Sequence, residues 1–132
     1  MITHVMTAEG YSLKYLQKKV QNTNESPNEG FKQKWRWLLI KIVFTFNIKF
    51  KAPEIVEPKI GFTELTTLDA RWTETRSETA KILSKLSDKE VNKTLWKHAI
   101  AGKLNLFHMV QFFEIHFKRH EKQIERTLAL VK

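Results

Sequence analysis

The stretch from Asn105 to Val131 constrains the fold most, because its apolar residues recur at helical spacing along its length. Charged side chains, among them Glu114, Lys118 and Glu125, fall on the opposite side. The pattern predicts a long amphipathic helix that begins after Asn105, since asparagine is a favoured N-cap residue. Its predicted core-facing stripe consists of Leu106, Val110, Phe113, Phe117, Ile124, Leu128 and Val131.

Two histidines, His116 and His120, interrupt this predicted buried side. On a helix, a spacing of four residues directs both imidazoles to nearly the same side, one turn apart. A ring nitrogen removed from water without a partner costs about 1 to 3 kcal/mol, so each imidazole needs something to bind it. One metal ion shared by both rings meets that need. The alternative is a pair of core histidines that are hydrogen-bonded to backbone or to a buried carboxylate.

Two imidazoles do not complete a metal site, because catalytic zinc-type sites usually have three protein ligands and an open position. His4 is the best candidate for the third ligand, since it lies in a different predicted helix that can pack antiparallel to the last one. His98 lies in the connection before the last helix and is a candidate for lining the pocket. The rotational position of His108 predicts a partly exposed side chain. Imidazole ligands suit zinc, nickel, iron or copper, and no residue stands out as a general base.

Several catalytic classes are excluded by what the sequence lacks. The chain has no cysteine, which removes disulfides, thiolate metal sites and a cysteine nucleophile. The residues between His116 and His120 are Phe117, Lys118 and Arg119, so the glutamate of a His-Glu-x-x-His zinc motif is absent. A Gly-x-Ser-x-Gly elbow and a glycine-rich phosphate loop are absent too. What the sequence offers for catalysis is therefore its histidines.

The formal charge of +9 raises the question of a nucleic-acid or anionic-membrane partner. The basic residues are spread over every segment, most densely from Phe31 to Lys59, without a known nucleic-acid-binding motif. We therefore expect a basic surface with no dedicated polyanion partner. The apolar run from Trp37 to Phe46 is about half the ~20 residues of a membrane span and no secretory signal precedes it, so we expect no membrane partner and a cytoplasmic location. We expect the four tryptophans to be core or pocket-wall residues.

Residues 1–132 are expected to form one domain, and 4 glycines with 3 prolines favour helices over a sheet. Apolar periodicity predicts three more helices, over residues 2–20, 31–46 and 63–86. Residues 21–30 read as a polar loop, within which Ser26-Pro27-Asn28-Glu29 has the form of a capping box that starts the second helix.

The connections between the later helices are predicted from turn and capping residues. Residues 49–61 contain two prolines and should be extended. Ser87-Asp88-Lys89-Glu90 has a second capping-box form and predicts a short helical turn. Residues 92–103 read as an irregular or strand-like connection with a turn at Gly102.

Three parts of the sequence, in order, resemble the DinB-like (YfiT-like) superfamily. Trp96–Leu104 is similar to that family's His-Pro-x-x-Gly-x-Leu turn, with Ala99 in place of the proline. Phe112–Ile124, which contains His-Phe-Lys-Arg-His-Glu-Lys-Gln-Ile, resembles the helix that follows this turn. The start, Ile2-Thr3-His4-Val5 with Glu9, is similar to the family's second helix, whose histidine completes a three-histidine metal site.

This resemblance implies an all-α, up-down four-helix bundle that binds a divalent ion, often nickel or zinc, through His4, His116 and His120. It also implies a metal-dependent hydrolase or a thiol S-transferase that acts on a small molecule or with a low-molecular-weight thiol. The family's first helix has no counterpart ahead of residue 2, so we expect it to be missing or supplied by a partner, and we expect a homodimer. The alternatives are a catalytically inert relic and a non-enzymatic basic protein that binds nucleic acid or another acidic partner.

Overall fold

The computed structural model describes residues 2–46, 48–49 and 64–131, and these residues are mostly helical. Two short antiparallel strands pair Trp96 with Leu104 and His98 with Gly102 just before the last helix. The all-α class is thus confirmed in general terms, with one small hairpin added. The elements are α1 (Ile2–Lys19), the 3-10 helix η1 (Val20–Glu25), α2 (Phe31–Thr45), α3 (Leu65–Ser84), α4 (Asp88–Val91), β1 (Trp96–His98), β2 (Gly102–Leu104) and α5 (Leu106–Val131).

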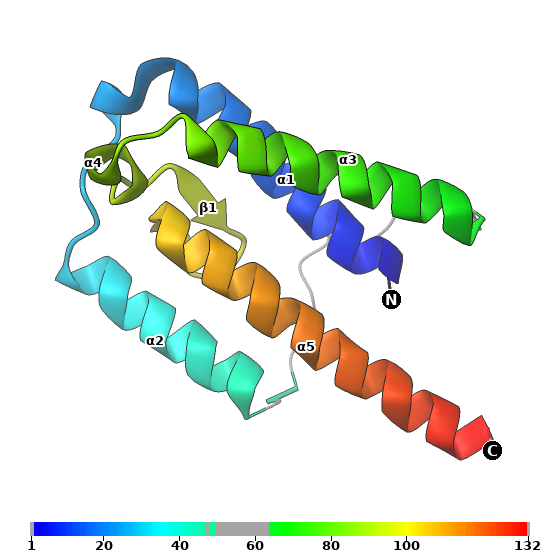
Figure 1. Ribbon diagram of the computed structural model, residues 1–132. Coiled ribbons are helices and arrows are strands. Elements are labelled where there is room, and N and C mark those ends of the chain that lie inside the picture. Colours follow the sequence, from blue (N-terminus) through cyan, green and yellow to red (C-terminus); the bar gives the residue numbers. More distant parts are fainter. Residues whose placement is uncertain (1, 47, 50–63, 132) are drawn as a thin grey trace.

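Figure 1 shows the four long helices as two pairs, α1 beside α3 and α2 beside α5. Contacts between α1 and α5 join the pairs, and the hairpin packs against α1, α2 and α5. Chain direction alternates from α1 to α2, α3 and α5, so α1 runs antiparallel to α5 (Figure 1). The described residues therefore supply four long helices, α1, α2, α3 and α5. The family's bundle topology, with its first helix missing or supplied by a partner, stays a prediction.

The hydrophobic core lies between the helix pairs and the hairpin. α1 contributes Leu16, α2 contributes Trp37, Ile40 and Phe44, and the hairpin contributes Trp96. The Trp96 indole donates a hydrogen bond of 2.9 Å to Ser12 Oγ of α1, so this buried N–H is satisfied. The remaining buried members of the core are Leu95, Ala101, Leu104, Leu106, Met109 and Phe112.

The predicted buried stripe of α5 is wrong in rotation. Its buried residues are Leu106, Met109, Phe112 and His116, which recur at three-and-four spacing. The predicted core residues Val110, Phe117, Leu128 and Val131 are exposed instead. Residues 106–117 are apolar on both sides of the helix, so periodicity alone does not identify the side that faces α1 and α2.

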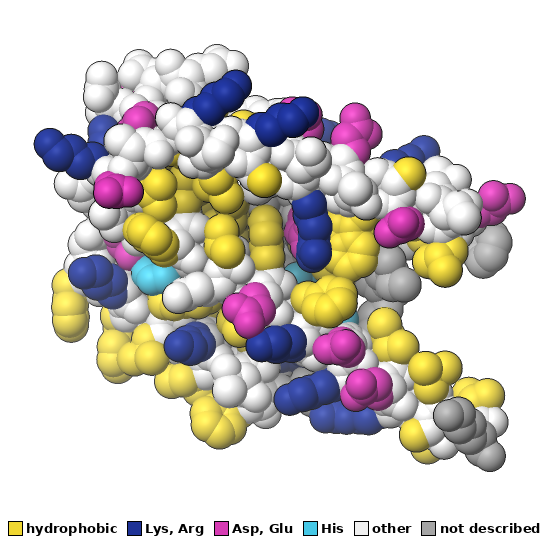
Figure 2. All heavy atoms as spheres, in the orientation of Figure 1, with side chains coloured by type: hydrophobic (Ala, Val, Ile, Leu, Met, Phe, Trp, Pro, Cys, Tyr) yellow, Lys and Arg dark blue, Asp and Glu magenta, His cyan; other side chains and the backbone are white. Residues whose placement is uncertain are grey.

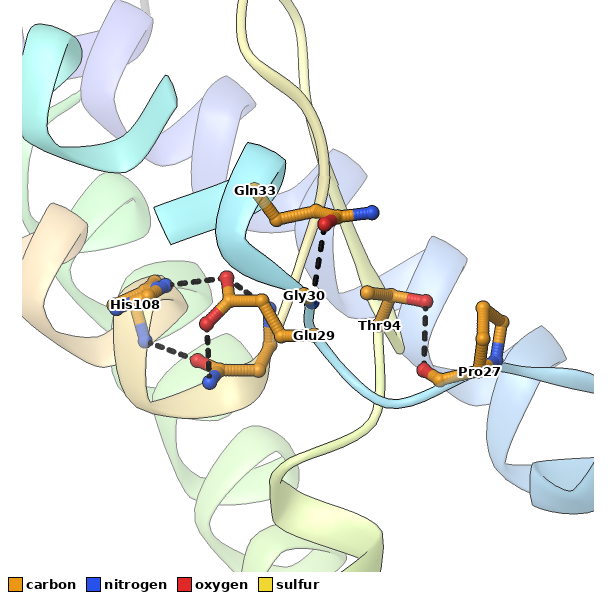
Figure 3. Close-up of polar contacts among 7 residues, drawn as sticks. Pro27, Glu29, Gly30, Gln33, Thr94 and His108 are labelled. Atoms are coloured by element: carbon orange, nitrogen blue, oxygen red, sulfur yellow. Dashed lines mark hydrogen bonds and ion pairs between the residues drawn. The ribbon is translucent and has the colours of Figure 1, made fainter. Parts of the chain in front are cut away.

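Helix positions predicted from the sequence agree with the structure to within two residues, but one predicted start is wrong. Ser26 does not cap α2, which begins at Phe31 after Gly30, with the Gly30 N–H donating to Gln33 Oε1 at 3.0 Å. The preceding segment pairs with residues 92–94 instead: the backbone N–H and the hydroxyl of Thr94 both donate to the Pro27 carbonyl (Figure 3). These contacts keep the segment extended. Residues 21–25 of the predicted polar loop 21–30 belong to the 3-10 helix η1.

The other predicted caps and turns are present. Ser87 and Glu90 form the reciprocal capping box that starts α4. Asn105 Oδ1 accepts the His108 N–H at 3.0 Å and so caps α5. Gly102 has φ of 79°, a conformation that disfavours other residues, at the turn into β2. The predicted extended segment 49–61 lies almost entirely outside the described residues.

A buried carboxylate fastens α1 to α3. Glu9 is 1% exposed and accepts hydrogen bonds from the Trp72 indole at 2.7 Å and from two nitrogens of the Arg76 guanidinium at 2.8 and 3.0 Å. The guanidinium carbon lies 4.4 Å from the centroid of the Trp72 ring. This arrangement fixes the rotation of α1, and with it the side from which His4 projects. None of the described helices combines the length and the apolar character needed to cross a membrane.

Candidate metal centre

Three imidazoles from the two ends of the sequence converge between α1 and α5. His4 lies in the first turn of α1, and His116 and His120 lie one turn apart on α5. His116 Nε2 is 3.0 Å from His120 Nε2 and 3.3 Å from His4 Nε2. One ring nitrogen from each histidine lies within 4.8 Å of the other two. The structure therefore brings together the three residues that were predicted as ligands.

These nitrogen separations are those that a metal ion would require. Bonds of about 2.0 to 2.1 Å at tetrahedral angles place two ligand nitrogens about 3.3 to 3.4 Å apart, and bonds at right angles place them about 3.0 Å apart. The two Nε2 pairs of His116 lie at 3.0 and 3.3 Å, within that span. Both separations from His116 Nε2 thus suit an ion shared with His4 and His120.

The surroundings of His116 do not provide the alternative partners considered from the sequence. The residue is 4% exposed, and its Nε2 faces the other two imidazoles. Its Nδ1 has no hydrogen-bond partner in the part of the chain that the structure describes. Among the described residues, the polar partners of this buried ring are thus the imidazoles of His4 and His120, within hydrogen-bond distance of its Nε2. A cation shared by the three rings would use their lone pairs together.

Burial keeps the two α5 imidazoles in the form that binds metals. Desolvation lowers the pKa of His116 from 6.5 to about 3, with a further lowering by the nearby His120 and His4. Desolvation also lowers the pKa of His120 to about 4, again helped by His4. Both rings are therefore neutral at pH 7, and a neutral imidazole has a free nitrogen lone pair for a metal.

Aromatic side chains set the orientation of the rings. The Phe112 ring stacks on His116 with 4.9 Å between centroids and 20° between planes, and Phe44 meets the same imidazole edge-on at 5.7 Å. Arg119, which lies between the two α5 histidines in sequence, donates to the Val43 carbonyl in the last turn of α2 and to the Ile48 carbonyl beyond that helix. These contacts join α2 to α5 beside the histidine cluster and restrict its movement.

The three histidines form part of the wall of a cavity of about 410 Å³, a size that suits a small molecule. Apolar and aromatic side chains make up much of this wall, and none of the described lining residues is a carboxylic acid. The other lining residues are Ala8, Tyr11, Ser12, Tyr15, Phe44, Trp96, Lys97, His98, Ala99, Ile100, Phe112, Arg119 and Gln123.

His98 lines the same cavity and is 5% exposed. Its Nδ1 accepts the backbone N–H groups of Ile100 and Ala101, each at 3.0 Å, so in the neutral ring the proton lies on Nε2. Burial lowers the pKa of His98 to about 4, which keeps the ring neutral. The hairpin turn thus holds His98 as a neutral hydrogen-bonding group.

His108 belongs to a different polar cluster. Its Nδ1 lies 2.7 Å from the carboxylate of Glu29 (Figure 3). Its side chain is 15% exposed, and its ring stacks on Trp37 with 4.9 Å between the centroids. Asn105 also donates its side-chain amide to Glu29, at 2.8 Å. The partial exposure of His108 was predicted, but its buried acidic partner was missed, because Glu29 was assigned to a capping box. The available signal was Glu29 itself, a charged residue that lies just before α2 and does not cap it.

The four tryptophans do not share one role. Trp37 and Trp96 are buried core residues, and Trp96 also lines the cavity. Trp72 of α3 is half-buried, and its indole N–H donates to Glu9 of α1. Trp35 is 54% exposed, so its predicted place in the core or the pocket wall is wrong. The reason is its position on the side of α2 opposite Trp37, which faces away from α5.

Comparisons of the chain with models of protein families, with curated proteins and with solved structures found no match. The resemblance to the DinB-like superfamily consequently rests on the motif residues of the sequence.

Proposed function

We propose that His4, His116 and His120 bind one divalent metal ion, and that the chain is a metal-dependent enzyme for a small molecule held in the adjoining cavity. The observation that carries this proposal is the convergence of the Nε2 atoms of His4 and His120 on the Nε2 atom of the buried His116, at 3.3 and 3.0 Å. Three protein ligands are typical of catalytic sites, whereas structural zinc sites are usually closed by four. Zinc and nickel are the ions that the donor set and the family resemblance favour.

Between the two reactions that the resemblance implies, the cavity favours thiol transfer over hydrolysis. When bound, the ion would act as a Lewis acid and would deprotonate a coordinating thiol outright or lower the pKa of a coordinating water. A metal-bound water would release one proton to solvent, and the hydroxide would keep a second proton that must leave during hydrolysis; none of the described lining residues is a carboxylate that could accept it. A coordinating thiol would release its single proton to solvent and would keep none. The low-molecular-weight thiol S-transferase is therefore the proposed activity.

The charge of the site supports the same choice. Three neutral imidazoles leave the full positive charge of a divalent ion uncompensated, and Arg119 adds a cation to the cavity wall. The apolar side chains of Phe44, Ile100 and Phe112 limit the access of water to this charge. An uncompensated positive charge in an apolar cavity attracts an anionic ligand such as a thiolate more strongly than a neutral one.

Calorimetric titration with zinc and with nickel tests the metal site. We expect one ion per chain for the native protein and a loss of affinity of about 100-fold or more for His4→Ala, His116→Ala and His120→Ala, since each removes one of three ligands. His108→Ala is the matched control, because this histidine also lies on α5 but contacts Glu29 instead. Unchanged affinity after the loss of His116 or His120 would rule out the proposed site.

The proposed reaction has a separate test. The metal-loaded protein is assayed with a low-molecular-weight thiol and an electrophilic acceptor, and in parallel with an activated ester, before and after removal of the ion with a chelator. We expect metal-dependent thiol conjugation that His116→Ala abolishes, with slower ester hydrolysis. Metal binding without either activity would contradict the enzyme and leave the metal site standing.

A further inference from the structure

α2 has apolar side chains on two opposite sides. Trp37, Ile40 and Phe44 point into the core and are 6 to 7% exposed. The opposite side, which we call the outer face of α2, consists of large apolar residues between 39% and 85% exposed. These residues are Phe31, Trp35, Leu38, Leu39, Ile42 and Phe46, which directly follows the helix. Figure 2 shows hydrophobic side chains gathered along this edge of the molecule, over α2.

The arrangement of the outer face is that of an amphipathic helix. At 100° per residue its six members fall within an arc of about 100°. Arg36 and Lys32 lie along one edge of this arc, and Lys34 and Lys41 lie along the other. No aspartate or glutamate occurs between residues 30 and 53 of the sequence. An exposed apolar stripe is thus bordered on both sides by positive charge alone.

We propose that the outer face of α2 docks on the surface of an anionic lipid bilayer, with the helix lying parallel to the membrane plane. Apolar side chains of such a helix insert at the boundary of the headgroups and the acyl chains, where tryptophan is favoured. Lysine and arginine at the edges of the stripe extend their apolar stems along it and place their charges among lipid phosphates. A helix of 15 residues that already packs on α5 lies on the membrane without spanning it.

The charge pattern favours an anionic bilayer over two other partners, a second copy of the chain and a nucleic acid. In a symmetric dimer built on this face, the Lys and Arg side chains of one copy would meet those of the other, with no acidic residue on α2 to pair with them. A nucleic acid would match the charge but would leave the aliphatic side chains of Leu38, Leu39 and Ile42 without apolar partners. An anionic bilayer satisfies both the charges and the apolar stripe. The expectation of no membrane partner rested on the absence of a spanning segment, which a helix lying on the bilayer surface does not need. The proposal does not depend on metal binding.

Vesicle co-sedimentation of the full chain tests the docking surface, with phosphatidylcholine vesicles and with vesicles that also contain phosphatidylserine. We expect binding to the anionic vesicles that weakens as salt is added, together with a blue shift of tryptophan fluorescence that Trp35→Phe removes. Leu38→Gln with Ile42→Gln should lower the partition coefficient more than about tenfold, because the inserted apolar area is lost. Lys34→Glu with Lys41→Glu should do the same by reversing charge.

The matched control is Val110→Gln with Leu128→Gln, which replaces two exposed apolar residues of α5 and should leave vesicle binding unchanged. Circular dichroism checks that every variant keeps its helical content. Equal binding to neutral and anionic vesicles, or no binding to either, would overturn the proposal. So would a concentration-dependent dimer in analytical ultracentrifugation that Leu38→Gln with Ile42→Gln dissolves, or tighter binding of single-stranded RNA than of anionic vesicles.

Discussion

His4 Nε2 lies 3.3 Å from His116 Nε2, although the two histidines are separated by 112 positions in the sequence. The contact exists because α1 and α5 run antiparallel, so that the first turn of α1 meets the middle of α5. The rotation of α1 that directs His4 toward α5 is held on the other side by Glu9, which binds Trp72 and Arg76 of α3. The histidine cluster therefore depends on packing at both sides of α1.

The contacts of the buried Glu9 carboxylate with Trp72 and Arg76 should contribute more to stability than an exposed ion pair does. Arg76→Ala leaves a carboxylate that is 1% exposed and keeps its hydrogen bond from the Trp72 indole, and we expect the free energy of unfolding to fall by about 1 to 3 kcal/mol. The value is below that of a fully buried pair because the Arg76 side chain is 51% exposed. Urea denaturation measures it. Lys81→Ala, which breaks the exposed pair with Glu78, is the control and should change stability by less than about 0.5 kcal/mol.

The stability of the metal-free protein should fall steeply in mild acid. The folded chain lowers the pKa of His98 to about 4 and of His116 to about 3, whereas the unfolded chain protonates them near 6.5. Between these values the unfolded state binds more protons, so this stabilisation is complete above pH 6.5 and is lost as pH falls toward 4. Each histidine contributes a slope of roughly 1.4 kcal/mol per pH unit at most. Urea midpoints measured from pH 7.5 to 5 with chelator present check this, and a flat profile contradicts the buried neutral rings.

The variant His116→Phe tests whether His116 is retained for metal binding or for folding. The side chain lies among Phe44 and Phe112, so a phenyl ring should pack there at a cost of less than about 1 kcal/mol to the metal-free protein at pH 7.5. It should also reduce the loss of stability in acid, because one titrating group is gone. Metal binding should fall by the same 100-fold or more as for His116→Ala. A loss of several kcal/mol in the metal-free protein would indicate that His116 is retained for folding.

The helices themselves could be predicted from the sequence, because capping residues and apolar periodicity act locally. Ser87 with Glu90 and Asn105 occupy the caps that their side-chain chemistry favours. Local rules failed where distant segments competed for the same groups. Ser26 did not cap α2, because residues 27–29 pair with residues 92–94 and the Glu29 carboxylate binds Asn105 and His108 of the α5 start.

The candidate site was predictable only in part. The spacing of His116 and His120 places them on one side of a helix, but no local rule brings His4 to them, and its assignment needed the family resemblance as well as a plausible antiparallel packing. The exposed position of Trp35 was missed for a related reason. α2 is apolar on two opposite sides, and composition does not say which side meets α5.

X-ray absorption spectroscopy of the zinc-loaded protein tests the central claim most directly, because it counts the imidazole nitrogens around the ion. The proposed site predicts one ion per chain with three histidine nitrogens at about 2.0 to 2.1 Å, and two in His4→Ala. His108→Ala should leave the spectrum unchanged, since its ring binds Glu29. Fewer than three histidines in the native protein, a spectrum that His4→Ala does not alter, or a failure to take up one ion per chain would contradict the claim.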